Sequence, residues 1–182
     1  AQKVTFVPLV GGVGRVRMEL HANSLAESLS RIYDGKFVPL HAPARVSSRN
    51  IRDELLKEDS LLPAIYLTQK LDIAVVGIGY PNEKSAIMAT GYFKENEIES
   101  LIDRKVAGEL CMQFYDIYGD TAPYKDDNNV IGMDISMLRS VPRSIGIAGG
   151  VEKLRAVRGA INGHYINTLI TDIECAEALI SE

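Results

Sequence analysis

One stretch of the sequence decides the fold, IAVVGIG at residues 73–79. It is a continuous apolar run rich in β-branched residues, which is the pattern of a strand buried on both faces. Further runs of this kind lie at Val4–Val10, Ser144–Ala148 and Ile166–Thr171. Because strands with both faces buried belong mainly to α/β proteins, these runs predict a mostly parallel sheet that helices cover on both faces.

Amphipathic helices are expected between the strands. The first starts at about Ser24, whose spacing to Glu27 is that of a capping box, and ends at Gly35. Pro63 suits the first turn of a later helix, because its missing N–H does little harm there. The remaining expected elements are helices at Ser48–Lys57, Ser60–Gln69, Glu95–Ile102, from Gly149-Gly150 to Ile161, and Ile173–Ile180, short strands at Phe37–Leu40 and Leu110–Tyr115, and a polar loop at Asp120–Asn129. These strand–helix units predict one α/β domain over residues 1–182.

The composition is that of a folded domain. The chain has 182 residues, of which 46% are hydrophobic, and a formal net charge of −4. These values exclude a disordered chain and disfavour a stand-alone DNA-binding domain, although a local basic patch remains open. No apolar run approaches the roughly 20 residues that a membrane-spanning helix needs. Cys111 and Cys175 give no disulfide framework, so we expect a cytoplasmic protein.

Glycines follow three of the predicted strands, as Gly11-Gly12-Val13-Gly14, as Gly79 and as Gly149-Gly150. Ligands of open parallel sheets bind beyond the carboxyl ends of the strands, and glycine lets a ligand approach the backbone closely. The alternative is that turns between strands and helices simply need glycine. Three such ends on one sheet edge favour a ligand crevice.

Known nucleotide and metal motifs are missing from these turns. The dinucleotide pattern would need glycine at positions 17 and 82, which are Arg17 and Asn82, and no phosphate loop ending in Gly-Lys-Ser/Thr occurs. The histidines, His21, His41 and His164, show no metal-ligand spacing. Neither a nucleophile elbow nor a pair of nucleophile and base is recognisable. We therefore predict no cofactor, no metal and no catalytic residue.

Lys153 is the main candidate for binding an anion. It follows Gly149-Gly150 in the first turn of a predicted helix, where backbone N–H groups attract negative charge. A phosphate there would receive backbone hydrogen bonds together with the charge of the lysine. A lysine opposes the helix dipole unless an anion is present. The alternative is an ordinary solvated lysine.

Other polar residues are weaker candidates. His21 and Asn23 follow the first glycine turn, from which they could reach a ligand at the sheet edge, although His21 could equally be a half-exposed loop residue. Glu109 stands among apolar residues at the start of a strand, where its carboxylate could accept hydrogen bonds from sugar hydroxyls. It could also be a paired surface charge, and residue spacing does not decide between the two.

A set of short motifs, each weak alone, runs through the whole chain in order. They are VPLVGGVG at residues 7–14, ANSLA at 22–26, DIAVVGIG at 72–79, VAGE at 106–109, FYD at 114–116 with Gly119, IGM at 131–133, IAGGVEK at 147–153 and LITD at 169–172. The set resembles the effector domain of the SorC family. These bacterial transcriptional regulators of sugar catabolism include the sorbose-operon, deoxyribonucleoside and central glycolytic gene regulators.

The resemblance implies a Rossmann-like three-layer α/β sandwich with a mostly parallel sheet, similar to glucosamine-6-phosphate deaminase, ribose-5-phosphate isomerase and CoA transferase. It also implies a phosphorylated sugar as effector, homodimers or homotetramers, and DNA binding through a separate N-terminal helix-turn-helix segment. The residues that fall where relatives contact the effector are Gly11, Gly12, His21, Glu109 and Lys153. The alternative is a sugar-phosphate isomerase or aminosugar-phosphate deaminase on the same fold, with Glu109 as base.

The sequence departs from the family pattern in two respects. Some relatives have arginine or lysine before the first glycine pair, for a phosphate or a Schiff base, whereas this chain has Val10. The family domain also begins with a strand–helix–strand stretch that ends in a Gly-Thr-Thr-like phosphate-binding turn. That stretch and the DNA-binding segment are absent from the sequence, so we expect the chain to be part of a longer protein.

Overall fold

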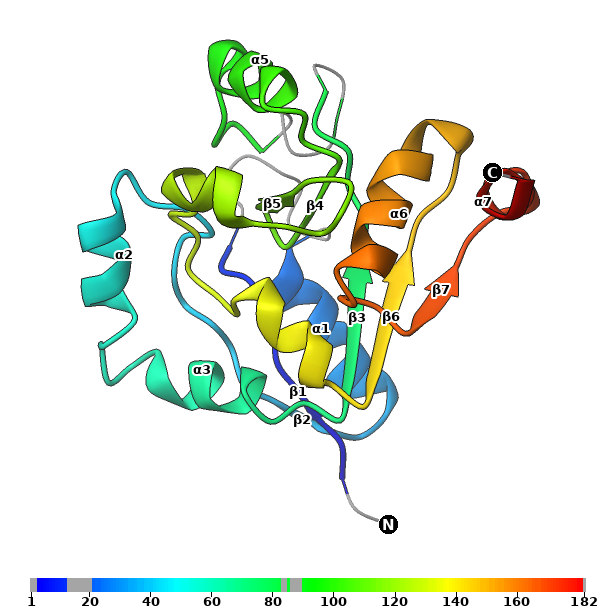
Figure 1. Cartoon of the computed structure of the whole chain (residues 1–182). Helices are drawn as coiled ribbons and strands as arrows, with labels where there is room; N and C mark the ends of the chain where they lie inside the picture. The colour runs from blue at the N-terminus through cyan, green and yellow to red at the C-terminus, as the bar shows by residue number, and fades with distance from the viewer. Residues whose placement is uncertain (1–2, 13–20, 83–84, 86–89, 182) are drawn as a thin grey trace. The chain divides into compact units, whose positions relative to one another are not determined.

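The computed structural model of the chain describes residues 3–12, 21–82, 85 and 90–181 (Figure 1). Val13, Gly14 and Arg17, which the glycine and dinucleotide patterns involve, lie outside these residues. The described residues divide into two compact units. The first unit comprises Ala1–Lys70 and Asn129–Met133, and the second comprises Leu71–Asn128 and Asp134–Glu182. The single domain expected over residues 1–182 stays a prediction.

The first unit combines a small parallel strand pair with short helices. In chain order its elements are β1 (Thr5–Phe6), α1 (Ala22–Ile32), β2 (Lys36–Phe37), α2 (Arg49–Leu55) and α3 (Leu62–Thr68). Strand β1 pairs with β2 in parallel. The core of this unit consists of Leu40, Leu61, Ala64 and Ile131, with half-buried aliphatic side chains such as Val7 and Val38 packed against it.

The strand predicted at Val4–Val10 is shorter and more exposed than expected. Only Thr5 and Phe6 lie in the ladder, and Val4 is 53% exposed. Pro8 stands two residues after β1, and Pro39 stands two residues after β2. Because proline has no N–H, neither strand can extend the ladder through its proline. The short strand expected at Phe37–Leu40 is displaced and shorter, because β2 comprises only Lys36 and Phe37.

Helix α1 begins earlier than predicted and ends in a different way. His21 is its N-cap residue, so Ser24 lies inside the helix and forms no capping box with Glu27. Asp34 takes the left-handed position after the helix, with φ of 47°, and the N–H of Gly35 then donates to the carbonyl of Ser30 at 2.7 Å. This is the Schellman arrangement, with aspartate where glycine is usual.

The helices expected at Ser48–Lys57 and Ser60–Gln69 are confirmed as the shorter α2 and α3. Ser48 is the N-cap of α2, and its side chain accepts a hydrogen bond from the N–H of Ile51. Pro63 lies in the first turn of α3. Both signals act within a few residues of the chain, so they can be read from sequence alone.

The second unit contains the main sheet. Strands β3 (Ile73–Gly77), β6 (Arg143–Ile147) and β7 (Thr168–Ile170) lie side by side in parallel, in the order β3-β6-β7 (Figure 1). The other strands and α-helices are α5 (Glu95–Asp103), β4 (Gly108–Leu110), β5 (Gln113–Tyr115), α6 (Leu154–Asn162) and α7 (Ile173–Ser181). The unit also contains the 3₁₀ helices η2 (Ala122–Asp127), η3 (Ile135–Ser140) and η4 (Val151–Lys153). The predicted α/β class with mostly parallel strands is confirmed.

Among the described residues, β3 is buried on one face and exposed on the other. Ala74 and Val76 are almost fully covered, whereas Ile73 and Val75 on the other face are 56% and 57% exposed. The expectation of burial on both faces is therefore wrong for β3 among the described residues. A reason lies in the connection of β6 through α6 to β7, because such a crossover places its helix on one face of a sheet.

Two further predictions are corrected in this unit. The strand expected over Leu110–Tyr115 is a hairpin, β4–β5, that turns at Cys111 and Met112. A Cys-Met pair carries none of the usual signals of a hairpin turn. The loop expected over Asp120–Asn129 contains a 3₁₀ helix, η2.

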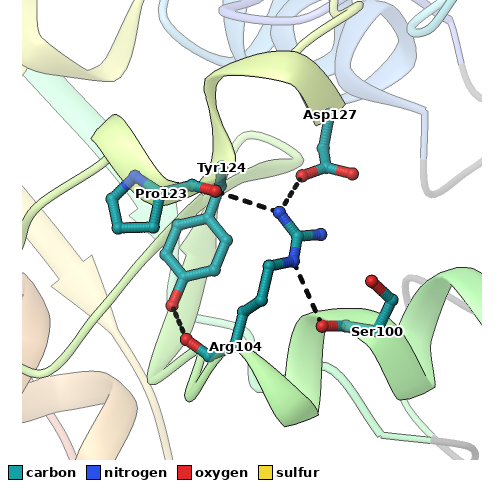
Figure 2. A network of polar contacts seen from close by, with 5 residues as sticks. All are labelled: Ser100, Arg104, Pro123, Tyr124 and Asp127. Carbon is teal, nitrogen blue, oxygen red and sulfur yellow. Dashed lines mark hydrogen bonds and ion pairs between the residues drawn. The ribbon is translucent and has the colours of Figure 1, made fainter.

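Arg104 at the end of α5 holds η2 in place (Figure 2). Its Nη1 donates to the carbonyl of Pro123 at 2.9 Å and to Oδ2 of Asp127 at 2.8 Å. Its Nε donates to the carbonyl of Ser100, and the hydroxyl of Tyr124 donates to the carbonyl of Arg104. The polar residues of this segment therefore serve packing between α5 and η2.

Candidate functional site

Gly79 and Glu109 meet at the carboxyl end of β3. Their backbones form an antiparallel bridge. The N–H of Gly79 donates to the carbonyl of Glu109 at 3.0 Å, and the N–H of Glu109 donates to the carbonyl of Gly79 at 2.9 Å. A Cβ atom on Gly79 would overlap the carboxylate of Glu109. The sequence therefore needs glycine at position 79 because the Glu109 side chain lies against it.

The environment of Glu109 favours its neutral form. Burial raises the pKa of its carboxyl group to about 7, while the N–H of Met112 and the charge of Lys153 lower it. The N–H of Met112 donates to Oε2 of Glu109 at 2.9 Å. A carboxyl group that titrates near neutral pH can accept hydrogen bonds when ionised and donate one when protonated.

An unusual turn holds this carboxyl group. Cys111 and Met112, which join β4 to β5, have φ of 50° and 64°, in the left-handed region that glycine and asparagine usually occupy. Burial and the nearby Glu109 raise the pKa of the Cys111 thiol to about 12, so it is not a reactive thiolate at neutral pH. The turn instead supplies the N–H of Met112 to Glu109.

A second carboxylate lies against the other glycine turn. Oδ2 of Asp172, just after β7, accepts from the N–H of Gly150 at 2.5 Å, and its Oδ1 accepts from the N–H of Cys175 at 2.8 Å. Gly150 has φ of 94°, and a Cβ on Gly149 would lie 2.9 Å from the same carboxylate. Gly149 thus leaves room for Asp172, whereas a Cβ on Gly150 would overlap the carboxylate of Glu152. Lys153 follows them at the end of η4 as a half-buried residue.

In the first unit, the predicted residues lie around the backbone that follows β1. The N–H groups of Gly11 and Gly12 donate to the carbonyls of Ile131 and Ala42 at 2.9 and 2.8 Å. A Cβ on Gly11 would come within 2.6 Å of the Ala42 carbonyl, whereas one on Gly12 would make an ordinary contact with His21 at 3.8 Å. Glycine is therefore required at position 11 by backbone packing.

Asn23 has a structural role in this unit. Its Nδ2 donates to the carbonyl of Leu40 at 3.0 Å, and its Oδ1 accepts from the N–H of Leu40 at 2.9 Å. The amide thereby joins α1 to the segment after β2. An effector contact by Asn23 stays a prediction.

The second unit thus brings Glu109 against Gly79 and within electrostatic reach of Lys153, which stands three residues after Gly150. Met112 and Asp172 were missed by the sequence analysis. Asp172 stands between an apolar strand and a helix, so the preference of aspartate for N-cap positions could have found its bond to Cys175. No local signal announces its bond to Gly150, which is 22 residues away.

A metal centre and a membrane span are both missing from the described part of the chain. Among the residues that the structure describes, no three His, Cys, Asp or Glu side chains gather as metal ligands would. The helices within these same residues lack the length and apolar character of a membrane span.

Comparison with protein families identifies the chain. The family model described as "Putative sugar-binding domain" matches residues 1–181, and the chain therefore belongs to this family.

Curated relatives are similar along nearly the whole chain. The sorbitol operon regulator of Klebsiella pneumoniae is 30% identical over 181 residues, which are 99% of this chain and 58% of the relative. The deoxyribonucleoside regulator of Bacillus subtilis is 26% identical over 98% of this chain and 57% of the relative. The transcriptional regulator LsrR of Escherichia coli K12 is 33% identical over 99% of this chain and 55% of the relative. The chain thus spans less than two thirds of the relatives it matches.

Solved structures agree with this assignment. The full-length sorbitol operon regulator SorC from Klebsiella pneumoniae superposes with a TM-score of 0.89 at 31% identity, over 99% of this chain and 59% of that structure. A DeoR family transcriptional regulator from Listeria monocytogenes superposes with a TM-score of 0.88 at 26% identity, over 97% of this chain and 69% of that structure. The resemblance to SorC-family sugar-binding domains and the expected α/β fold are confirmed.

Proposed function

We propose that this chain is the effector-sensing domain of a cytoplasmic bacterial transcriptional regulator, and that its effector is a phosphorylated sugar. The observation that carries the proposal is the position of Glu109, whose backbone is bridged to Gly79 beyond the carboxyl end of β3 and whose carboxyl group feels the charge of Lys153. A carboxyl group suits sugar hydroxyls, and a lysine suits a phosphate. The names of the relatives as transcriptional regulators support the same function.

Within this proposal, Gly79 and Gly149 leave room for neighbouring carboxylates at the site. Gly79, Gly149 and Gly150 shape the backbone around Glu109 and Lys153. An effector contact by Gly11, Gly12, His21 or Asn23 stays a prediction. DNA binding belongs to a separate segment of the full-length protein. The oligomer is a homodimer or homotetramer, and effector binding changes its affinity for the operator.

An enzyme on the same fold is the alternative. The pKa of Glu109, raised to about 7 by burial, would suit a general base in an isomerase or deaminase. The relatives are named as regulators, which favours the sensing role. Turnover of ribose 5-phosphate or glucosamine 6-phosphate by the full-length protein would support the enzyme instead.

Calorimetric titration of the full-length protein tests the proposal. The panel contains sorbitol 6-phosphate, fructose 6-phosphate and deoxyribose 5-phosphate, together with each unphosphorylated parent. We expect one or more of the phosphorylated sugars to bind and to change the protein's affinity for DNA from upstream of its own operon. Absence of binding across the panel, with DNA affinity unchanged, would contradict the proposal.

A further inference from the structure

One carboxylate joins two loops at the carboxyl edge of the β3–β6–β7 sheet. Asp172 follows β7, and its oxygens accept from the N–H of Gly150, after β6, at 2.5 Å and from the N–H of Cys175, in α7, at 2.8 Å. These bonds, with Cys175 as the stronger donor, hold the pKa of Asp172 below its ordinary value. Asp172 is thus a negative charge at neutral pH, at the turn that leads into η4.

The bond to Gly150 exceeds what capping a helix requires. An aspartate at an N-cap needs only an N–H two or three residues further along the chain. Asp134 shows this simpler arrangement in the same unit, because it caps η3 through the N–H of Ser136 at 2.8 Å. The contact of Asp172 with Gly150 adds a long-range connection, and Gly149 leaves room for it.

This contact has a consequence for any anion at Lys153. The N–H of Gly150 is already taken by a carboxylate, so a phosphate must rely on Lys153 and on the N–H groups that follow in the turn. The carboxylate of Asp172 lies against Gly149 and that of Glu152 lies against Gly150, so a phosphate bound by the remaining N–H groups of this turn would lie close to both charges. Like charges that lie close together repel one another appreciably near a protein surface.

We propose that Asp172 is a specificity-determining residue of the effector site: it holds the Gly149–Gly150 turn and repels free phosphate. Binding at Lys153 then requires the additional hydrogen bonds that sugar hydroxyls make with Glu109. A repulsive element of this kind rejects the wrong ligand without a contact of its own to the right one. The inference rests on the proposed function, because it takes Lys153 as the partner of the effector phosphate.

The test measures binding of inorganic phosphate to the full-length protein at low ionic strength by calorimetry. Asp172→Asn keeps hydrogen-bond acceptors but loses the charge, and Asp134→Asn is the matched control at the other capping aspartate. We expect Asp172→Asn to bind phosphate about tenfold more tightly than the wild type, and Asp134→Asn to leave the affinity unchanged. A purely structural role for Asp172 would instead weaken binding of every probe.

A second variant covers a failure of the first to fold. Asp172→Ser retains an N-cap oxygen without charge, and melting by circular dichroism reports whether each variant is folded. The inference is overturned if both variants bind phosphate no more tightly than the wild type, or if neither folds. Failure of the wild type to bind any sugar phosphate would overturn the proposed function. The repulsion of free phosphate by Asp172 would still be supported in that case if the variants bound inorganic phosphate more tightly than the wild type.

Discussion

The backbone N–H of Met112 donates to Oε2 of Glu109 across a turn of only two residues, at a distance of 2.9 Å. This bond fixes the carboxyl group against Gly79, at the end of β3. Both turn residues adopt left-handed conformations, which cost roughly 1–2 kcal/mol each for residues other than glycine. Such strain concentrates at functional sites, where it orients a chemically important group.

Stability is expected to depend on pH through Glu109. Its pKa rises from 4.5 to about 7 in the folded protein because burial disfavours the charged form. Between these values the folded state holds a proton that the unfolded chain has released. The stabilisation is thus fully present below the unfolded pKa and is lost as the pH rises through the folded one.

Urea unfolding between pH 4.5 and 8 measures this effect. We expect the wild type to lose about 2–3 kcal/mol of unfolding free energy over the range, and Glu109→Gln to lose much less. Glu99→Gln, an exposed change on α5, is the control and should follow the wild type. Parallel pH profiles for wild type and Glu109→Gln would contradict the assignment.

Gly79→Ala is expected to disturb the site, because the added methyl group would overlap the Glu109 carboxylate. We expect the free energy of unfolding to fall by about 1–3 kcal/mol, as in other overpacked positions. Gly77→Ala is the matched control on the same strand, since a Cβ there meets nothing within 4 Å. Equal effects of the two changes, measured by urea unfolding, would refute the steric argument.

Lys153→Ala is expected to weaken a phosphorylated effector by roughly 1.5–3 kcal/mol, the range for a hydrogen bond to a charged group. The affinity for the unphosphorylated parent sugar should stay unchanged, because it lacks the charge that Lys153 binds. Calorimetry on both members of a sugar pair gives the comparison, with Lys125→Ala on η2 as an exposed control. An equal loss for both sugars would remove Lys153 from the phosphate contact.

Lys105→Gly is expected to raise the free energy of unfolding by about 1 kcal/mol, because Lys105 has φ of 61° directly after α5 and glycine adopts that conformation without strain. Asp103→Gly, inside the same helix, should lower it by about 1 kcal/mol. Chemical denaturation of the two variants decides the point. Destabilisation by both changes would show that φ at position 105 carries no strain.

The elements that depend on neighbouring residues were predictable from sequence. Helices α2 and α3 lie within their predicted ranges, and Pro63 in the first turn of α3 follows from the conformational preference of proline. The apolar runs located the three strands of the main sheet, and the ordered motifs identified the family. Glu109 and Lys153 were predicted as separate candidates, and their proximity emerges only from the fold.

Only the tertiary structure shows which groups require glycine at positions 79 and 149. The glycine pattern predicts room for a ligand at Gly79 and Gly149, whereas the fold places the carboxylates of Glu109 and Asp172 against them. The fold also decided that Cys111 and Met112 turn the chain. These contacts join residues as far apart in the chain as Gly79 and Glu109, or depend on packing that outweighs local preference. Local conformational energy therefore determines the elements and their order, while burial and long-range hydrogen bonding determine which groups meet at their ends.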